Sequence, residues 1–309
     1  MRTQLYVLTG FLGAGKTTLL LRLLEHLEGH KVGVIQNESG KVGIDGAITR
    51  RDAVEMIEIN NGSIFCACHK NGFVTTLASM AKREFEYLLV ESTGIGDPSN
   101  VEWIVEKARE SAGDRFDFRG VICLVDAANF VWQLALHEEA RRQIKHCHMA
   151  VITKGDLVSR AVVQEAETAI RGIHPLCPIH RSVQGDLSPA FLEEDLLQYR
   201  WTEAEESLNN RDSRPKTIFV NVKEPVDRKE LLAFLQAVAP EVLRVKGFVP
   251  VTGEGMQQVD VVGRVMALRP TALQEAAQLV FISAKGPAVI RDVAAAWKAH
   301  VHAAMDIKN

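Results

Sequence analysis

The sequence predicts an α/β fold in which helices cover both faces of a mostly parallel sheet, followed by a smaller C-terminal α+β domain. Short apolar runs alternate with helical segments over about the first 170 residues. Alternation of this kind is typical of a parallel sheet buried between helices. The rhythm changes after a polar, turn-rich stretch at 203–216, which we interpret as a linker between domains 1–202 and 217–309.

Five apolar runs in the first domain are expected to form buried strands. They cover residues 5–9, 31–36, 87–91, 120–126 and 149–153. Spacing or composition predicts helices between and after them, over residues 17–29, 71–83, 99–110, 138–146 and 160–172. In parallel sheets of this kind ligands bind beyond the carboxyl ends of the strands, so motifs at those ends are the functional candidates.

The C-terminal domain shows a different order of elements and no catalytic constellation. The pattern predicts strands over 217–222, 241–251, 257–262, 264–268 and 279–283, with helices over 227–238 and 288–304. This order indicates a ferredoxin-like arrangement.

Composition excludes several classes of protein. The 309 residues are 47% hydrophobic and 24% charged, and the formal net charge is -3, which does not suit a binder of nucleic acid or of a membrane surface. No apolar run approaches the roughly 20 residues of a membrane span. The chain runs directly into its first strand, so we expect no export signal. The odd count of five cysteines then favours the reducing cytoplasm, with thiols serving as ligands or core residues.

A glycine-rich loop follows the first apolar run and precedes the first helix. It fits the phosphate-binding pattern G-x-x-x-x-G-K-[ST] in its required setting, which makes the predicted fold one of the P-loop NTPase type. The loop amides and the helix N-terminus would bind phosphate, Lys16 would reach the β- and γ-phosphates, and Thr17 would ligate Mg²⁺. The expected nucleotide-binding residues of this loop are Gly10, Gly13, Ala14, Gly15, Lys16, Thr17 and Thr18.

Two further motifs end apolar strands. In the first, Glu91 could hold Mg²⁺ through a water, and the backbone N–H of Gly94 could meet the γ-phosphate. The second, residues 153–156, resembles the guanine-binding motif Asn-Lys-x-Asp, with Thr153 in place of Asn. Asp156 would accept hydrogen bonds from the ring N–H and exocyclic amine of guanine, a donor pattern that adenine lacks. Lys154 would lie over the base.

A candidate transition-metal site lies between the first two motifs. Cys66, Cys68 and His69 offer two thiolates and an imidazole within four residues, and Glu38 is a natural further ligand. This set suits Zn²⁺ best, and also Co²⁺, Ni²⁺ or Fe²⁺. The alternative is a pair of half-buried core thiols beside a surface histidine. A second trio, residues 146–148, could also bind metal, although such trios are more often divided between core and surface.

Taken together, these motifs resemble those of the CobW-type GTPases, relatives of the UreG and HypB nickel-insertion proteins. The matching segments, in the family's order, are residues 9–18, 37–40, 60–62, 91–98 and 153–156. The family's metal signature is Asn-Gly-Cys-x-Cys-Cys. This chain instead has Ser63 and Phe65 at two of the thiol positions, while Cys68 and His69 are added just downstream.

The resemblance implies a Mg²⁺-dependent GTPase that carries a transition metal and couples GTP turnover to delivery of the metal, or of a metal cofactor, to a client metalloprotein. Lys16, Thr17, Glu91 and Gly94 would form its catalytic group. The alternative is a nucleotide switch that activates a metalloenzyme or cobalamin-dependent enzyme without carrying metal. An ATP-dependent kinase is disfavoured by the motif at 153–156. Because no Gln or Arg finger is assignable, we expect slow turnover, with activation by a homodimer or by the client.

Overall fold

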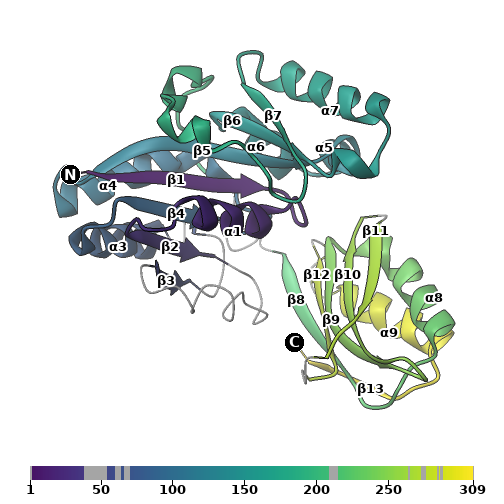
Figure 1. The fold of residues 1–309 in the computed structure, drawn as a ribbon. Helices are drawn as coiled ribbons and strands as arrows, with labels where there is room; N and C mark the ends of the chain where they lie inside the picture. Colours follow the sequence, from purple (N-terminus) through teal and green to yellow (C-terminus); the bar gives the residue numbers. More distant parts are fainter. Residues whose placement is uncertain are drawn as a thin grey trace. The chain divides into compact units, whose positions relative to one another are not determined.

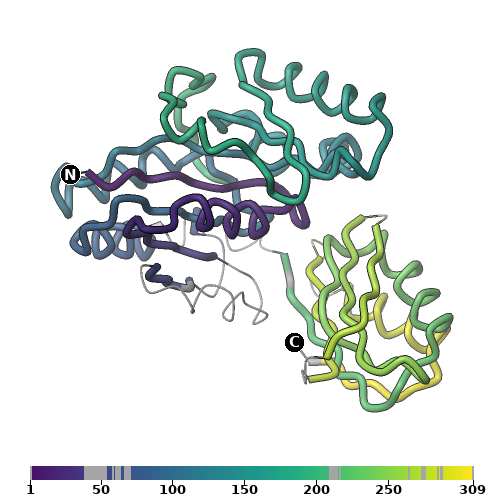
Figure 2. The backbone as a smooth tube through the Cα atoms, in the orientation of Figure 1, coloured from purple at the N-terminus to yellow at the C-terminus, as the bar shows by residue number. Residues whose placement is uncertain are grey.

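The computed structural model describes residues 2–37, 54–59, 64–65, 70–208, 215–263, 265–272, 276–283, 285 and 288–308. The chain divides into two compact units, Met1–Asp212 and Ser213–Asn309, each built on its own sheet. Figure 1 labels the elements of both units, and Figure 2 traces the backbone through them. None of the helices in the described part of the chain is long and apolar enough to cross a membrane.

The first unit contains a seven-stranded sheet in the order β3-β2-β4-β1-β5-β6-β7, and every neighbouring pair is parallel. The strands are β1 (Thr3–Gly10), β2 (Val32–Gln36), β3 (Val54–Glu58), β4 (Tyr87–Glu91), β5 (Phe116–Asp126), β6 (Met149–Thr153) and β7 (Ile179–Ser182). The central strand β1 therefore lies between β4 and β5 (Figure 1).

Helices cover both faces of this sheet. They are α1 (Lys16–His26), α3 (Lys70–Met80), α4 (Val101–Ala112), α5 (Phe130–Leu136), α6 (Glu138–Lys145) and α7 (Arg160–Ile173). Short 3-10 helices lie at Ala81–Arg83, Pro98–Asn100, Gly155–Leu157, Pro189–Glu193 and Leu196–Tyr199. Alternate side chains of a strand point to opposite faces. Leu5 of β1 accordingly packs in the cluster that contains α3, α4 and α7, whereas Tyr6 packs in the cluster that contains α1.

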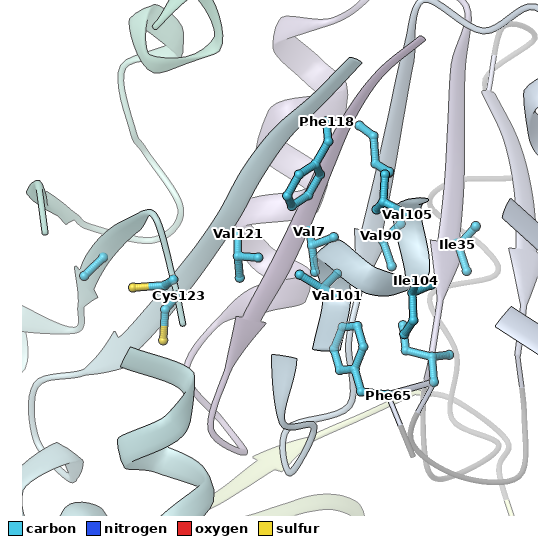
Figure 3. Packing of buried hydrophobic residues seen from close by; sticks show 14 of the residues in the cluster. Val7, Ile35, Phe65, Val90, Val101, Ile104, Val105, Phe118, Val121 and Cys123 are labelled. Carbon is cyan, nitrogen blue, oxygen red and sulfur yellow. The ribbon is translucent and has the colours of Figure 1, made fainter. Parts of the chain in front are cut away.

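Figure 3 shows the first of these clusters, where Val7, Val90 and Val121 on the strands pack against residues of α4. The α/β fold predicted from the sequence is confirmed, as are its five expected strands. Two outer strands, β3 and β7, and the short helix α5 were not predicted. Among the described strands, each of these two pairs with a single neighbour. Edge strands are less buried and more polar, so they lack the apolar run of a central strand.

The second unit contains a six-stranded antiparallel sheet in the order β11-β10-β9-β12-β8-β13. Its elements are β8 (Lys216–Val222), α8 (Arg228–Val238), a 3-10 turn (Ala239–Glu241), β9 (Arg244–Val251), β10 (Gly255–Val262), β11 (Val265–Pro270), β12 (Gln278–Ser283), α9 (Val289–His300) and β13 (Met305–Lys308). Strand β12 lies between β8 and β9, and β13 lies on the other side of β8. This is the ferredoxin-like order, extended at one edge by the hairpin of β10 and β11.

The closing helix is shorter than predicted. We expected it to continue to residue 304, but α9 ends at His300 and the chain then forms β13 beside β8. Trp297 explains the change of direction, because its indole N–H donates to the carbonyl of Ala303 at 2.8 Å. The same ring packs edge-on against Phe234 in the core between α9 and α8.

Strands β9 and β12 approach so closely at Gly247 that no side chain fits there. Gly247 has φ +151, and a Cβ at this position would lie 2.0 Å from the carbonyl oxygen of Gln278. We expect Gly247→Ala to destabilise the C-terminal unit by about 3 kcal/mol, since the strands must separate and the backbone is strained. Calorimetric unfolding of the full chain measures this loss. Gly253→Ala, which has φ +77 but no heavy atom near its Cβ, should cost only about 1 kcal/mol. Equal losses for the two variants would contradict this account.

Candidate functional site

The carboxyl ends of five parallel strands meet at one edge of the first sheet. These strands end at Gly10, Gln36, Glu91, Asp126 and Thr153. The register places Gln36 beside Glu91 and Asp126 beside Thr153. Parallel pairing therefore brings polar residues that are distant in the sequence to the edge where ligands bind in this class of sheet.

The loop after β1 has the backbone of an anion-binding site. Its three glycines have positive φ values of 135°, 76° and 93°, and α1 begins directly after the last of them. Consecutive N–H groups in such a loop point inward, and the helix N-terminus adds partial positive charge. Lys16 is buried, and its ammonium donates to the carbonyls of Gly10 at 2.8 Å and Phe11 at 3.2 Å. Ala14 is also buried in the loop, whereas Thr18 is exposed on the first turn of α1.

A hydroxyl and a carboxylate meet beside this loop. The Thr17 hydroxyl donates to one oxygen of the buried Glu91 carboxylate at 2.6 Å. The side-chain amide of Gln36 donates to the other oxygen at 3.0 Å and so fixes the orientation of the carboxylate. Hard oxygen donors of this kind suit Mg²⁺, which binds through one or two protein oxygens and substrate phosphates. The sequence predicted Thr17 and Glu91 but not Gln36, which belongs to no motif.

The loop that follows β4 packs on the phosphate loop. A Cβ added to Gly94 would lie 2.6 Å from a methyl carbon of Leu12, so only glycine allows this approach. The Gln143 side-chain amide on α6 donates to the carbonyls of Gly94 at 3.3 Å and Gly96 at 2.9 Å. Residue 94 therefore lies beside the phosphate loop, and Gln143 of α6 holds its carbonyl.

The motif at 153–156 also touches the phosphate loop. The Thr153 hydroxyl donates to the carbonyl of Ala14 at 2.8 Å and links the end of β6 to that loop. Lys154 follows in the left-handed conformation, with φ 57, and its ammonium pairs with Asp126 at 2.7 Å. Asp156 lies on the short 3-10 helix beyond it and is exposed. The structure thus places the expected guanine-binding residues next to the expected phosphate-binding residues.

The predicted transition-metal ligands Glu38, Cys66, Cys68 and His69 lie outside the described residues. Within the described ranges, no three His, Cys, Asp or Glu side chains are grouped so that they could hold a metal ion.

The described residues next to these ligands are held by two asparagines. The Asn37 side chain donates to the carbonyl of Ile59 at 2.9 Å and accepts from the N–H of Ile64 at 3.0 Å. The Asn100 side chain donates to the carbonyl of Phe65 at 2.9 Å. Phe65 itself is fully buried in the core beside α4 (Figure 3). Of the two positions where the family motif has a thiol and this chain does not, Phe65 is therefore part of the hydrophobic core.

The trio His146, Cys147 and His148 is buried. The Cys147 sulfur lies 3.8 Å from that of Cys177, and burial raises the pKa of the Cys147 thiol well above its usual value. His148 Nδ1 accepts from the backbone N–H of Val121 at 3.0 Å. A neutral thiol and an imidazole bound to backbone are core groups, so the structure does not support a metal site here.

A buried ion pair that the sequence did not predict connects the loop after β4 to the end of the first unit. The fully buried Asp97 carboxylate accepts from Arg142 Nε at 2.8 Å and from the N–H of Leu208 at 2.7 Å. The same guanidinium also pairs with Glu205 and donates to the carbonyl of Glu206, both at 2.8 Å. Residues 205–208 are therefore bound to the loop that follows Gly94.

Both units of the chain are similar to known proteins. Residues 4–181 match the family model for the CobW/HypB/UreG nucleotide-binding domain, and residues 216–296 match that for the cobalamin synthesis protein cobW C-terminal domain. The chain is 28% identical to the zinc chaperone YjiA of Escherichia coli (strain K12), over 80% of this chain and 82% of that protein. It is 26% identical to the zinc chaperone CobW of Sinorhizobium sp, over 81% and 82%. A crystal structure of Zn(II)-bound YjiA GTPase from E. coli aligns with 97% of this chain and 99% of its own, at 23% identity and a TM-score of 0.49.

His146 makes stability depend on pH. Burial lowers its pKa from 6.5 to about 4, against the weaker opposing effect of Glu205, whose carboxylate lies 3.7 Å away. Between these values the unfolded chain binds the extra proton and the folded chain does not, so stability present above pH 6.5 is lost as the pH falls. We expect a loss of about 2 kcal/mol between pH 6.5 and 5 from this group. Denaturant unfolding at several pH values in this range gives the free energy of unfolding as a function of pH. This free energy should depend less steeply on pH in His146→Gln than in the parent protein, and equally steeply in the exposed His26→Gln. Identical slopes for His146→Gln and the parent protein would rule this out.

Proposed function

Because the chain belongs to the CobW/HypB/UreG family, we propose that it is a GTP-binding and GTP-hydrolysing metallochaperone. It carries a transition metal and couples GTP turnover to the delivery of this metal, or of a metal cofactor, to a client metalloprotein. The observation that carries the proposal is the meeting of Thr17 and Glu91, 74 positions apart, beside a phosphate loop that encloses Lys16.

GTP is the substrate of the proposed site. Lys16 and the loop amides stabilise the charge on the β- and γ-phosphates, and the N–H of Gly94 responds to the γ-phosphate. Thr17 would hold Mg²⁺, and Glu91 would assist through water. The metal ion, when bound, neutralises charge on the phosphate oxygens. Asp156 selects guanine and Lys154 lies over the base.

The proposed cargo is Zn²⁺, held by Glu38, Cys66, Cys68 and His69, with Co²⁺, Ni²⁺ or Fe²⁺ as other candidates. Two similar proteins, from E. coli and Sinorhizobium, are named zinc chaperones, which supports this choice. Asn37 and Asn100 supply a route for coupling. Asn37 joins residues 59 and 64 to the end of β2, and Asn100 joins residue 65 to the start of α4. Movement of the loop after β4 on loss of the γ-phosphate would then reach the metal ligands.

We assign nucleotide binding to residues 1–202, with 203–216 as the linker and 217–309 as the second domain. The proposed setting is the reducing cytoplasm, as the cysteine usage predicts. The client, or a second copy of the chain, would accelerate a slow intrinsic turnover.

A second candidate function is a nucleotide switch that activates a metalloenzyme or cobalamin-dependent enzyme without carrying metal. The burial of Phe65 favours it, since an aromatic ring packed in the core cannot serve as a ligand in place of the family's thiol. Metal content distinguishes the two functions: a switch that carries no metal would be isolated without zinc when purified in the absence of chelators.

Guanine selection by Asp156 predicts a change of nucleotide. Asp156→Asn should weaken GTP binding on the order of 100-fold and improve binding of XTP, because the 2-oxo group of xanthine accepts from the new amide. Titration with fluorescent nucleotide analogues measures both affinities, and the exposed Glu165→Gln on α7 serves as the acid-to-amide control. Competition by ATP as strong as that by GTP in the unmodified protein would contradict the guanine assignment.

Metal carriage predicts a loss of zinc binding in a thiol variant. Cys66→Ser combined with Cys68→Ser should lower Zn²⁺ affinity by two orders of magnitude or more, because hydroxyls are poor ligands for this ion. The measurement is a competition titration against a chromophoric chelator, with GDP and with a non-hydrolysable GTP analogue. Cys123→Ala removes a thiol from the core and should leave zinc binding unchanged. If the double variant kept full affinity, the metal half of the proposal would fail.

A further inference from the structure

A buried carboxylate that none of the motifs includes lies at the same edge of the sheet. Asp126 ends β5, and its side chain is completely buried. One oxygen accepts from the N–H of Ala128 at 3.0 Å, and the other accepts from the Asn129 side chain at 2.9 Å and from the Lys154 ammonium at 2.7 Å. A buried charge is costly unless it is paired and hydrogen-bonded, so this arrangement needs the ammonium in place.

Lys154 is fixed at both ends. Its backbone follows β6 in the left-handed conformation, with φ 57 and ψ 21, which non-glycine residues seldom adopt. The register sets Asp126 directly beside Thr153, so the carboxylate lies next to the residue that precedes Lys154. The ammonium is held there, while about a third of the side chain remains exposed. The four methylene groups between the two fixed ends therefore have few conformations available.

We propose that Asp126 is a positioning residue for nucleotide binding. By holding the Lys154 ammonium, it keeps the aliphatic stem of this lysine as a preformed wall for the purine ring, next to the loop where Asp156 contacts the base edge. Asp126 makes no contact with the nucleotide and acts through Lys154. The inference rests on the proposed function, because it requires a guanine nucleotide at this site.

Asp126 and Asp156 are expected to have different effects on nucleotide binding, because they lie at different positions relative to the base. A wall for the purine ring contributes to the affinity for any purine of similar shape, whereas a carboxylate on the base edge reads the exocyclic amine. Loss of Asp126 releases the ammonium, and the stem must then be ordered when the nucleotide binds. The affinity should fall without a change in base preference.

The test compares the binding of GDP and IDP, which lacks the exocyclic amine, to the full chain. We expect Asp126→Asn to weaken both nucleotides about tenfold with an unchanged ratio. Asp156→Asn should change the ratio instead. Glu167→Gln, which breaks the ion pair with Arg181 on the surface of the same unit, is the matched control and should change neither affinity.

A double-mutant cycle separates positioning from a general loss of structure. In the Lys154→Met background, Asp126→Asn should have no further effect on the Kd for GDP, because the ammonium that it held is gone. A tenfold loss in both backgrounds would show that Asp126 does not act through Lys154 and would overturn the inference. The thermal unfolding of each variant is also measured without nucleotide, so that a general loss of structure is detected.

If Asp126→Asn does not fold, the unmodified protein still provides a test. After ¹³C reductive methylation, the Lys154 methyl signal should show the fast transverse relaxation of an ordered group, whereas that of the exposed Lys82 should relax slowly. Transverse relaxation as slow as that of Lys82 would overturn the inference. A parent protein that binds GDP normally while Asp126→Asn leaves its Kd unchanged refutes the positioning role alone. A parent protein that binds no guanine nucleotide refutes the proposed function and the inference together.

Discussion

The chemistry of the first unit depends on the parallel pairing of β1 with β4 on one side and β5 on the other. The register sets Leu8 beside Glu91 and Gly10 beside Leu124. Because neighbouring strands are about 4.8 Å apart, the loops that follow these three strands begin close to one another. A Cβ on Gly10 would lie 2.3 Å from the carbonyl of Leu124, which shows how closely the phosphate loop begins against β5. A side chain at this position would separate the strands on which the site is built.

Much of the fold could be predicted because central strands and amphipathic helices leave strong patterns. The run at 149–153 is apolar up to its last residue, Thr153, and β6 is indeed buried along its whole length. The strand β7 could not be found in this way, because Ile179–Ser182 contains a histidine and an arginine. Among the strands that the structure describes, it pairs only with β6. The end of α9 was also missed. A helical pattern continues past His300, and the chain turns there through a hydrogen bond from Trp297 that no local pattern reveals.

The same distinction between local patterns and long-range contacts applies to the candidate site. Residues in contiguous motifs, such as Lys16 and Thr153, could be predicted because the chemistry requires them at a fixed spacing. Gln36, Asp126 and Arg142 could not, since their contacts depend on which strands and helices become neighbours. Of these, Asp126 left the clearest signal, a carboxylate at the end of an apolar strand expected to be buried. The transition-metal ligands remain a prediction from the sequence alone.

The buried pair of Asp97 and Arg142 bears on where the first unit ends. The residues that complete it come from 205–208, beyond the limit of 202 expected from composition. A shortened protein that stops at Thr202 would leave a carboxylate in the interior with one fewer donor and a guanidinium with two fewer acceptors. The pair itself would remain, but each buried group left without a hydrogen-bond partner typically costs about 1–3 kcal/mol. Anyone expressing the nucleotide-binding half by itself would therefore do better to extend the clone at least through Leu208, and a poorly behaved shorter fragment would say little about the intact molecule.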